Sequence, residues 1–333
     1  MARYIHDQNK VVLVHESGTY AATSGNGVWP GQVTSHSIDD AENKIEGRYF
    51  GTGDRSYDTM DLGPRDVTGT ITYNPQNFMT VFMAIGSVYD ASSGANVLHT
   101  ATEVNTDARQ SAFTSGPLNP LRSFTIEDSK TAVGTGTNFI RTINGIVPNA
   151  TSIIATQGEK VRVEQTYVGQ TLTFSSGNTT SVTTDTTTPY LWSSTTLTMG
   201  GNSIVTAKDI TLEINNNVTG PHYLNGSRDV SVPFPGNRDN TLSVTLDLAS
   251  ETAKALYETY YKDNTEFNAT LDFNQTSTGS QHAAFTLSGC RITSMENPSE
   301  LDGPTETTVE VMIENVSAQE WTSSVAGLNF NPW

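Results

Sequence analysis

Cysteine is nearly absent from the sequence. Cys290 is the only one among 333 residues, so an internal disulfide framework is excluded. Stability must therefore come from sheet pairing, from packing of the apolar residues, or from association with other chains. Cys290 lies in an apolar segment between Leu287 and Ile292, which favours a buried strand position over a reactive thiol.

Basic residues are also scarce. Lysine and arginine number 18 against 35 acidic residues, which gives a net charge of -17. Proteins that bind nucleic acid tightly contact its phosphates through clustered lysine and arginine, so this composition argues against tight nucleic-acid binding. It is compatible with a surface along which DNA passes without sticking, and equally with adaptation to salt. Composition alone does not separate these two causes.

Long apolar runs are missing as well. No run is long enough to span a bilayer, and residues 1–7 lack the apolar core of a secretory signal. We therefore expect a soluble protein that is made in the cytoplasm and has no membrane partner.

The sequence lacks the motifs of common catalytic sites. It has no Gly-x-Ser-x-Gly, no His-Glu-x-x-His and no phosphate-binding glycine loop before a helix, and its six histidines show no metal-ligand spacing. Residues 272–276 begin like a calcium loop, but Ser277 and Ala283 replace the required glycine and glutamate. We expect no enzyme activity, no metal and no cofactor.

The most informative stretch that is present runs from Asp58 to Gly86. Residues 67–73 alternate as a half-buried strand does, and Asn74-Pro75 is typical of a helix start. Four apolar residues then recur at helical spacing, and Gly86 follows where a left-handed cap is expected. These four residues are Phe78, Val81, Phe82 and Ile85. The stretch predicts a strand followed by a docked helix.

A similar stretch follows 173 positions later. Nine identities fall in a window of about 31 positions, where unrelated sequence would give roughly two. They pair Asn43, Gly47, Gly53, Arg55, Gly63, Arg65, Asp66, Thr68 and Thr72 with Asn216, Gly220, Gly226, Arg228, Gly236, Arg238, Asp239, Thr241 and Thr245. Residues 250–261 again favour a helix. We interpret the repeat as a tandem duplication.

The sequence therefore predicts a mainly β protein of two tandem β-sandwich or half-barrel units, each with one flanking α-helix. The expected segments are an N-terminal arm at 1–30 with one strand near 11–14, a first unit at 31–172, a Thr/Ser-rich hairpin or linker at 173–202, a second unit at 203–317 and a C-terminal tail at 318–333. Residues 87–119 are expected to be loosely organised.

Charged residues of the repeat are candidates for contacts between copies of the chain or between larger assemblies of them. They are Arg55, Arg65, Asp66, Arg228, Arg238 and Asp239. A loop ion pair that fixes a turn is the simpler explanation of the duplicated Arg-Asp pairs. The alternative is that both copies present the same charged loop to an identical neighbour.

Several of these features resemble one family. Glu16-Ser17-Gly18-Thr19-Tyr20, the pattern Trp-Pro-Gly-x-Val at 29–33 and Arg-Asp-x-Thr-Gly-Thr-Ile-Thr-Tyr at 65–73, followed by an external helix, are similar to the major tail tube proteins of long-tailed phages and tailed archaeal viruses. The resemblance implies β-sandwiches that form rings, and rings that stack into a tube through which the genome leaves the virion.

The resemblance also implies the partners. Relatives with one unit form rings of six chains, whereas two fused units would close the same ring with three. The partners would be further copies of the chain, other tail proteins at the tube ends, and viral DNA that passes through the lumen without specific binding. The acidic composition then suggests a saline, haloarchaeal host.

Polar strand faces are the candidates for lining the lumen. They are Thr68, Thr70, Thr72, Asp209, Glu213, Thr241, Thr245, Asp247, Glu310 and Glu314. Carboxylates and hydroxyls at these positions would repel or merely hydrate a phosphate backbone. An ordinary solvated outer face explains any single one of them as well.

Two other functions remain open. A sugar-binding or adhesin-type sandwich requires aromatic residues grouped on one exposed face, for which Tyr190, Trp192 and Trp321 are the candidates. A hydrolase on a β scaffold requires a pair of acidic residues in a cleft, and no such pair is evident.

Overall fold

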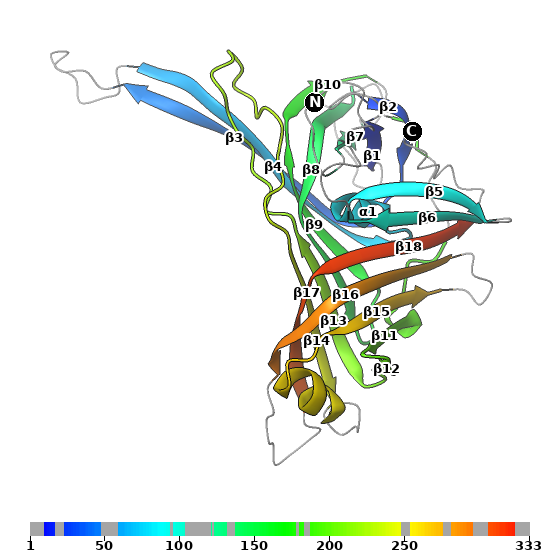
Figure 1. Ribbon diagram of the computed structural model, residues 1–333. Coiled ribbons are helices and arrows are strands. Elements are labelled where there is room, and N and C mark those ends of the chain that lie inside the picture. Colours follow the sequence, from blue (N-terminus) through cyan, green and yellow to red (C-terminus); the bar gives the residue numbers. More distant parts are fainter. Residues whose placement is uncertain are drawn as a thin grey trace.

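The computed structural model describes residues 10–16, 23–47, 59–93, 96–103, 121, 123–131, 137–177, 180–182, 187–247, 254–275, 281–295 and 306–323. This part of the chain is mainly β-structure, as predicted (Figure 1). The strands up to residue 175 are β1 (Lys10–Glu16), β2 (Thr23–Val28), β3 (Gly31–Gly47), β4 (Thr59–Pro75), β5 (Ser87–Ser93), β6 (Asn96–Thr102), β7 (Phe124–Lys130), β8 (Phe139–Thr156), β9 (Arg162–Gly169) and β10 (Thr171–Ser175). The later strands are β11 (Thr195–Met199), β12 (Asn202–Ser203), β13 (Ala207–Asn215), β14 (Asp239–Asp247), β15 (Phe267–Asn274), β16 (Gln281–Met295), β17 (Glu306–Ile313) and β18 (Asn315–Ser323). The helices are α1 (Met79–Ile85), the 3-10 turn η2 (Trp192–Ser194) and the π-helix η3 (Leu256–Lys262).

The strands form three connected antiparallel sheets. The long sheet has the order β3-β4-β9-β8-β13-β14-β17-β16 and runs from the projecting β3–β4 hairpin to the end where η3 lies (Figure 1). The first small sheet has the order β2-β1-β7-β8-β10, and the second has the order β12-β11-β15-β16-β18-β6-β5. Strands β8 and β16 each belong to the long sheet and to one small sheet.

Each of these two shared strands changes sheet next to a glycine. Gly145 of β8 and Gly289 of β16 have φ values of 65° and 66°, a conformation that residues with a Cβ adopt only under strain. A Cβ on Gly289 would also clash with the Glu314 side chain. The two glycines therefore allow one strand to serve two sheets.

The pairing of β1–β4 and β7–β10 recurs in β11–β18. The first small sheet contains β1, β2, β7, β8 and β10, and the second contains their counterparts β11, β12, β15, β16 and β18. In the long sheet the two corresponding sets of four strands lie side by side. The register recurs too, since Val67 lies opposite Gly169 and Asn240 lies opposite Ile313. The β5–β6 hairpin has no counterpart among the described strands of the second half.

The core lies between the long sheet and the two small sheets. In β14, Leu242, Val244 and Leu246 are buried, whereas Thr241, Ser243 and Thr245 point to the opposite face. This alternation, with a period of two, places one face of the long sheet on the core and turns the other away from it.

The helix α1 confirms the predicted helix, although its setting differs from the prediction. Its start is Met79 rather than Pro75, because Asn74 and Pro75 still belong to β4. Gly86 ends the helix at φ 157°, outside the left-handed helical region. All seven residues of α1 are buried, and the helix contacts β5, β6, β8 and β18. It is therefore an internal helix, not the external one expected.

The second predicted helix is present as Lys254 and Ala255 followed by η3, and residues 250–253 lie outside the described part. Cys290 is buried, as predicted, and burial raises the pKa of its thiol to about 11.

Four segments are more ordered than the sequence indicates. The predicted arm contributes the β1–β2 hairpin, and the predicted loose stretch contains the β5–β6 hairpin. The predicted linker contains η2, β11 and β12, and the predicted tail begins inside β18. These strands are short or lack clear alternation, so their partners rather than their own sequences define them.

Candidate assembly surfaces

The side of the long sheet that faces away from the core is a mainly polar surface, which we call the acidic face. Its carboxylates include Asp39, Asp66, Glu164, Asp209, Glu213, Asp239, Asp247, Glu306 and Glu310. They alternate along their strands with residues that point to the core. A single row of this face crosses five strands through Thr72, Glu164, Ser152, Glu213 and Thr241.

Few cations accompany these carboxylates. Arg162 forms an ion pair with Glu164 at 3.2 Å, and Lys208 forms one with Glu306. Both side chains are thereby committed to a carboxylate of the same face. The remaining outward positions are mostly threonine and serine, for example Ser243, which donates a hydrogen bond to Glu310 at 2.7 Å. The face therefore offers carboxylates and hydroxyls to whatever lies against it.

Nine of the ten residues predicted to line a lumen lie together on the acidic face. They are Thr68, Thr70, Thr72, Asp209, Glu213, Thr241, Thr245, Asp247 and Glu310. The tenth, Glu314, lies in the turn between β17 and β18 beside Gly289, not within a strand of the sheet.

The long sheet ends in two open edges. Among the described residues, β3 pairs with β4 alone, and residues 291–295 of β16 pair with β17 alone. An open edge presents unpaired backbone N–H and C=O groups and is a template for pairing with another chain.

Arg238, one of the predicted contact residues, lies where the two halves of the chain meet. Its guanidinium donates to Asn216 Oδ1 at 2.8 Å and to the Ala84 carbonyl of α1 at 3.1 Å, and lies 3.0 Å from Glu103. Glu103 in turn accepts hydrogen bonds from Asn240 and from Val316 N–H. Arg238 therefore joins β14 to the C-terminal end of α1.

Arg65 and Asp66 lie at the base of the β3–β4 hairpin. Arg65 forms a bidentate pair with Asp40 at 2.6 and 2.8 Å, and its backbone N–H donates to the Arg228 carbonyl. His222 lies 2.8 Å from Asp66. Segment 217–238 therefore lies alongside the base of the hairpin. Arg55 lies outside the described residues.

The repeat also fixes an asparagine beside each aspartate. Asn43 donates to Asp66 at 3.3 Å, and Asn217 donates to Asp239 at 2.8 Å. The strand pairing thus matches Asn43 with Asn217, one position later than the Asn216 that the sequence comparison predicted. The comparison was wrong by one residue in this strand because it allowed no gap.

Apolar side chains are exposed on the projecting hairpin and on the segment beside it. Ile45, Met60 and Leu62 of the hairpin are each more than half exposed. Tyr223 and Leu224 of segment 217–238 are exposed as well. The register places Met60 and Leu62 on one face of the hairpin and Ile45 on the other, so both faces of this projection offer apolar side chains to another protein.

Sequence reasoning missed the buried carboxylates. Glu320 accepts hydrogen bonds from the Phe78 N–H and the Tyr190 O–H, both at 3.0 Å. Glu16 accepts bonds from Thr125 and from Gly145 N–H, both at 2.7 Å. Their partners lie more than 100 positions away, so no local pattern could have revealed them.

A second buried polar cluster joins β3 to the first small sheet. His36 lies 2.7 Å from Tyr167 Oη and 3.7 Å from Asp128, which also pairs with Arg141. Burial alone would raise the pKa of Asp128, but its bonds to His36 and Arg141 hold that pKa below its ordinary value. The cluster fixes the position of the edge strand.

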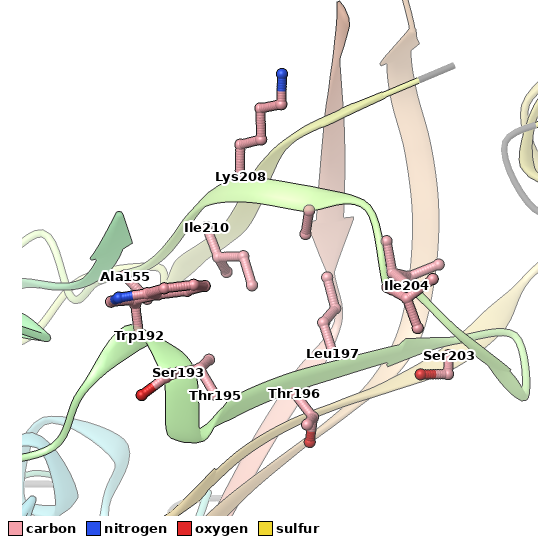
Figure 2. A pocket seen from close by; sticks show the side chains of 12 residues that line it. Ala155, Trp192, Ser193, Thr195, Thr196, Leu197, Ser203, Ile204, Lys208 and Ile210 are labelled. Carbon is pink, nitrogen blue, oxygen red and sulfur yellow. The ribbon is translucent and has the colours of Figure 1, made fainter. Parts of the chain in front are cut away.

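One cavity of about 260 Å³ lies beside β11 and β13. Figure 2 shows Trp192 close to Ala155, with Leu197 and Ile204 across the cavity and Lys208 pointing away from it. Its lining contains no carboxylate, so the acidic pair that a hydrolase requires is not in this cavity.

The three aromatic residues considered for sugar binding do not share an exposed face. Tyr190 is fully buried and stacks on Phe78, with the ring centroids 4.9 Å apart. Trp321 of β18 stacks on His282 of β16, with the ring centroids 4.7 Å apart. Of the three residues, Trp192 alone is exposed, and it lies beside the cavity. The grouping that an adhesin-type sandwich requires is therefore not observed for these residues.

The described helices are all too short, or too polar, to cross a membrane. Nor does the described part of the chain contain three histidine, cysteine, aspartate or glutamate side chains placed to hold one metal ion.

Comparison with known families gives one match. The family model described as phage tail tube protein matches residues 82–318, well over half of the chain. No curated protein matches the chain. The matched region contains most of the long sheet, including all of β8, β9, β13, β14, β16 and β17. The chain therefore belongs to the phage tail tube protein family.

Proposed function

We propose that this protein is the major tail tube subunit, that each chain contains two fused tube units, and that three chains close one ring. Membership of the family makes the chain a structural, non-enzymatic component of the virion tail that assembles with itself into a tube. The number of chains, their contacts and the lumen are our proposal. The observation that carries it is an acidic sheet face bounded by two open edges.

The recurring strand order supports two fused units. The equivalent strands extend from residue 10 to 175 and from residue 195 to 323. These limits revise the sequence-based units at 31–172 and 203–317, because the β1–β2 hairpin and its β11–β12 counterpart each belong to a small sheet. Two similar units in one chain make a ring of six units from three chains.

Ring closure follows from the edges of the long sheet. Within the chain, β8 of the first unit pairs with β13 of the second, so the two four-stranded parts already form one sheet. Repeating this arrangement around an axis uses both open edges and leaves none exposed. A heterologous contact of this kind closes into a ring when its rotation is a whole fraction of a turn.

The acidic face is our candidate for the lumen wall. The core covers the opposite face of the long sheet, and this supports the acidic face as the side that borders the channel. Its carboxylates would repel the phosphates of a passing genome, and its hydroxyls would hold water. DNA would then meet few attractive sites while leaving the virion.

The duplicated charges take two places in this arrangement. Arg238 lies at the boundary between the units of one chain, and its counterpart Arg65 lies beside the open edge of β3. We propose that Arg65 and Asp66 stand at the boundary between chains. The β3–β4 hairpin and segment 217–238, with their exposed apolar residues, would contact the next ring or the tail proteins at the tube ends.

Sedimentation and electron microscopy of the purified protein test this proposal. We expect trimers that associate, as the concentration rises, into hollow rods with three chains per ring. A species that stays monomeric at the highest attainable concentration would contradict it. Glycan binding by such a monomer would favour the adhesin-type alternative.

A further inference from the structure

We propose that the ring closes through one defined register, in which β3 of one copy pairs with residues 293–295 of β16 of the next copy. Ala41 then lies opposite Ser294, Glu42 opposite Thr293, and Asp40 opposite Met295. The inference rests on the proposed function, because it specifies how the proposed ring is joined. Its basis is the β8–β13 junction inside the chain.

The internal junction supplies the geometry. Ala150 of β8 lies opposite Asn215 of β13, and the strands are antiparallel. Asn216 N–H donates to the Asn149 carbonyl at 2.7 Å, so these two residues form a hydrogen-bonded pair. The adjacent pair, Ala150 and Asn215, is therefore a non-hydrogen-bonded pair, in which the side chains are closest.

Strand β16 corresponds to β8 with a shift of 144 positions. The pair Val147–Val168 of the first half matches Arg291–Met312 of the second, where both residues are shifted by 144. The register break after Pro148 likewise recurs at the corresponding position in β16. By this shift Ala150 corresponds to Ser294.

Strand β3 corresponds to β13 with a shift of 174 positions. Ser35 lies opposite Thr72 as Asp209 lies opposite Thr245, and each strand has a register break just before this pair. By this shift Asn215 corresponds to Ala41. The internal pair Ala150–Asn215 thus predicts the pair Ser294–Ala41 between copies.

The two edges are suited to this pairing. Ala41 and Ser294 are both exposed, and both belong to the acidic face, because Asp39 lies opposite Thr68 and Ser294 lies opposite Glu310. Their side chains would meet on the same side of the joined sheet, as alternation in a continuous sheet requires. Both backbones lack a second strand partner within the described residues.

A cysteine pair tests the register directly. Non-hydrogen-bonded pairs have Cα atoms about 4.5 Å apart, within the range that a disulfide can bridge. We expect the double variant Ala41→Cys with Ser294→Cys to form a covalent trimer after mild oxidation and to return to single chains with dithiothreitol. The native Cys290 is buried and stays in place.

The matched control is Ser37→Cys with Ser294→Cys. Ser37 lies on the same exposed side of β3, four residues from Ala41 and therefore about 13 Å away along the strand. This pair is out of disulfide range, so the control should remain single chains on a denaturing gel although it assembles. An equimolar mixture of the two single variants, Ala41→Cys and Ser294→Cys, should give covalent dimers and no trimers.

The outcomes separate this inference from the proposed function. If three-chain rings form, and the covalent trimer appears in the Ala41–Ser294 variant but not in the Ser37 control, the register and the proposed function are both supported. Three-chain rings without that crosslink, or with the crosslink in the Ser37 control, overturn the register and leave the proposed function standing. An absence of rings in the unsubstituted protein overturns both.

Discussion

Glu320 holds the start of α1 in place. Its carboxylate is buried and accepts hydrogen bonds from Phe78 N–H at the start of α1 and from Tyr190. Burial raises the pKa of the neighbouring Tyr73, and the negative charge of Glu320 adds to that shift. Glu320 thus links α1 to β18, the last strand of the described chain.

Replacing Glu320 should therefore destabilise the whole chain. Glu320→Ala leaves two buried donors without this acceptor, which is expected to lower the free energy of unfolding by about 2 to 4 kcal/mol. Urea unfolding followed by tryptophan fluorescence measures the effect. Gln319→Ala is the control, because Gln319 is exposed on the same strand and should change stability little. Equal losses in both variants would contradict the role assigned to Glu320.

Asp40 gives a prediction that depends on pH. The bidentate hydrogen bonds from Arg65 hold the pKa of the Asp40 carboxyl below its ordinary value. Because this pKa is lower in the folded state, the pair stabilises the protein fully at pH values above the unfolded-state pKa of about 3.9. The stabilisation is lost as the pH falls through the folded-state pKa.

We expect Asp40→Asn to lower the free energy of unfolding by about 1 kcal/mol at pH 7, because the pair is partly exposed. The difference from the unsubstituted protein should shrink towards pH 2. Denaturation curves across this range measure it, with Asp39→Asn as the exposed neighbouring control. A difference that stays constant down to pH 2 would show that the ion pair is not its source.

At the level of the elements, the three sheets are joined by β8 and β16, each of which changes sheet next to a glycine. Gly289 combines a φ of 66° with a position where a Cβ would meet Glu314. Gly289→Ala should cost about 1 to 2 kcal/mol from the left-handed conformation alone. Gly177→Ala is the control, because nothing lies near its Cβ position. Thermal unfolding compares them, and equal melting temperatures would contradict the strain at Gly289.

The elements also show what the sequence could predict. The apolar face of α1 was predictable, because Phe78, Val81, Phe82 and Ile85 follow the helical period within one short segment. The alternation within β13 and within β17 likewise predicts that Asp209, Glu213 and Glu310 lie on the polar faces of their strands. Local periodicity determines these properties, so local sequence is sufficient.

Properties set by distant residues were not predictable. The burial of α1 depends on contacts with β6 and β18, and β18 comes more than 200 positions later. The hydrogen bond from Arg238 to the Ala84 carbonyl joins residues 154 positions apart, so local sequence did not predict it either. Short strands such as β5 and β12 carry too few alternating residues to be recognised without their partners.

At the scale of the whole molecule, the acidic face makes a prediction about DNA. Glu213→Lys with Glu310→Lys would replace two of its carboxylates by cations, and the assembled variant should then retain short duplex DNA at low salt. Binding should weaken steeply as the salt concentration rises, because phosphate contacts release counterions. Co-sedimentation of labelled DNA with the assembled protein measures this.

Glu258→Lys with Asp263→Lys is the matched control. Both residues are exposed, at η3, and their substitution changes the net charge by the same amount away from the acidic face. Retention of DNA should be clearly weaker than in the variant of the acidic face. Equal retention by both would mean that net charge, and not the lining of a channel, controls the contact with DNA.

Electron cryomicroscopy of the assembled protein would show which residues border the channel and how many chains form each ring. We expect a hollow tube with three chains in each ring, a continuous inner wall made of the long sheets, and Asp209, Glu213 and Glu310 facing the channel. A tube in which these three residues face outward or lie between rings, or a ring with a number of chains other than three, would contradict it.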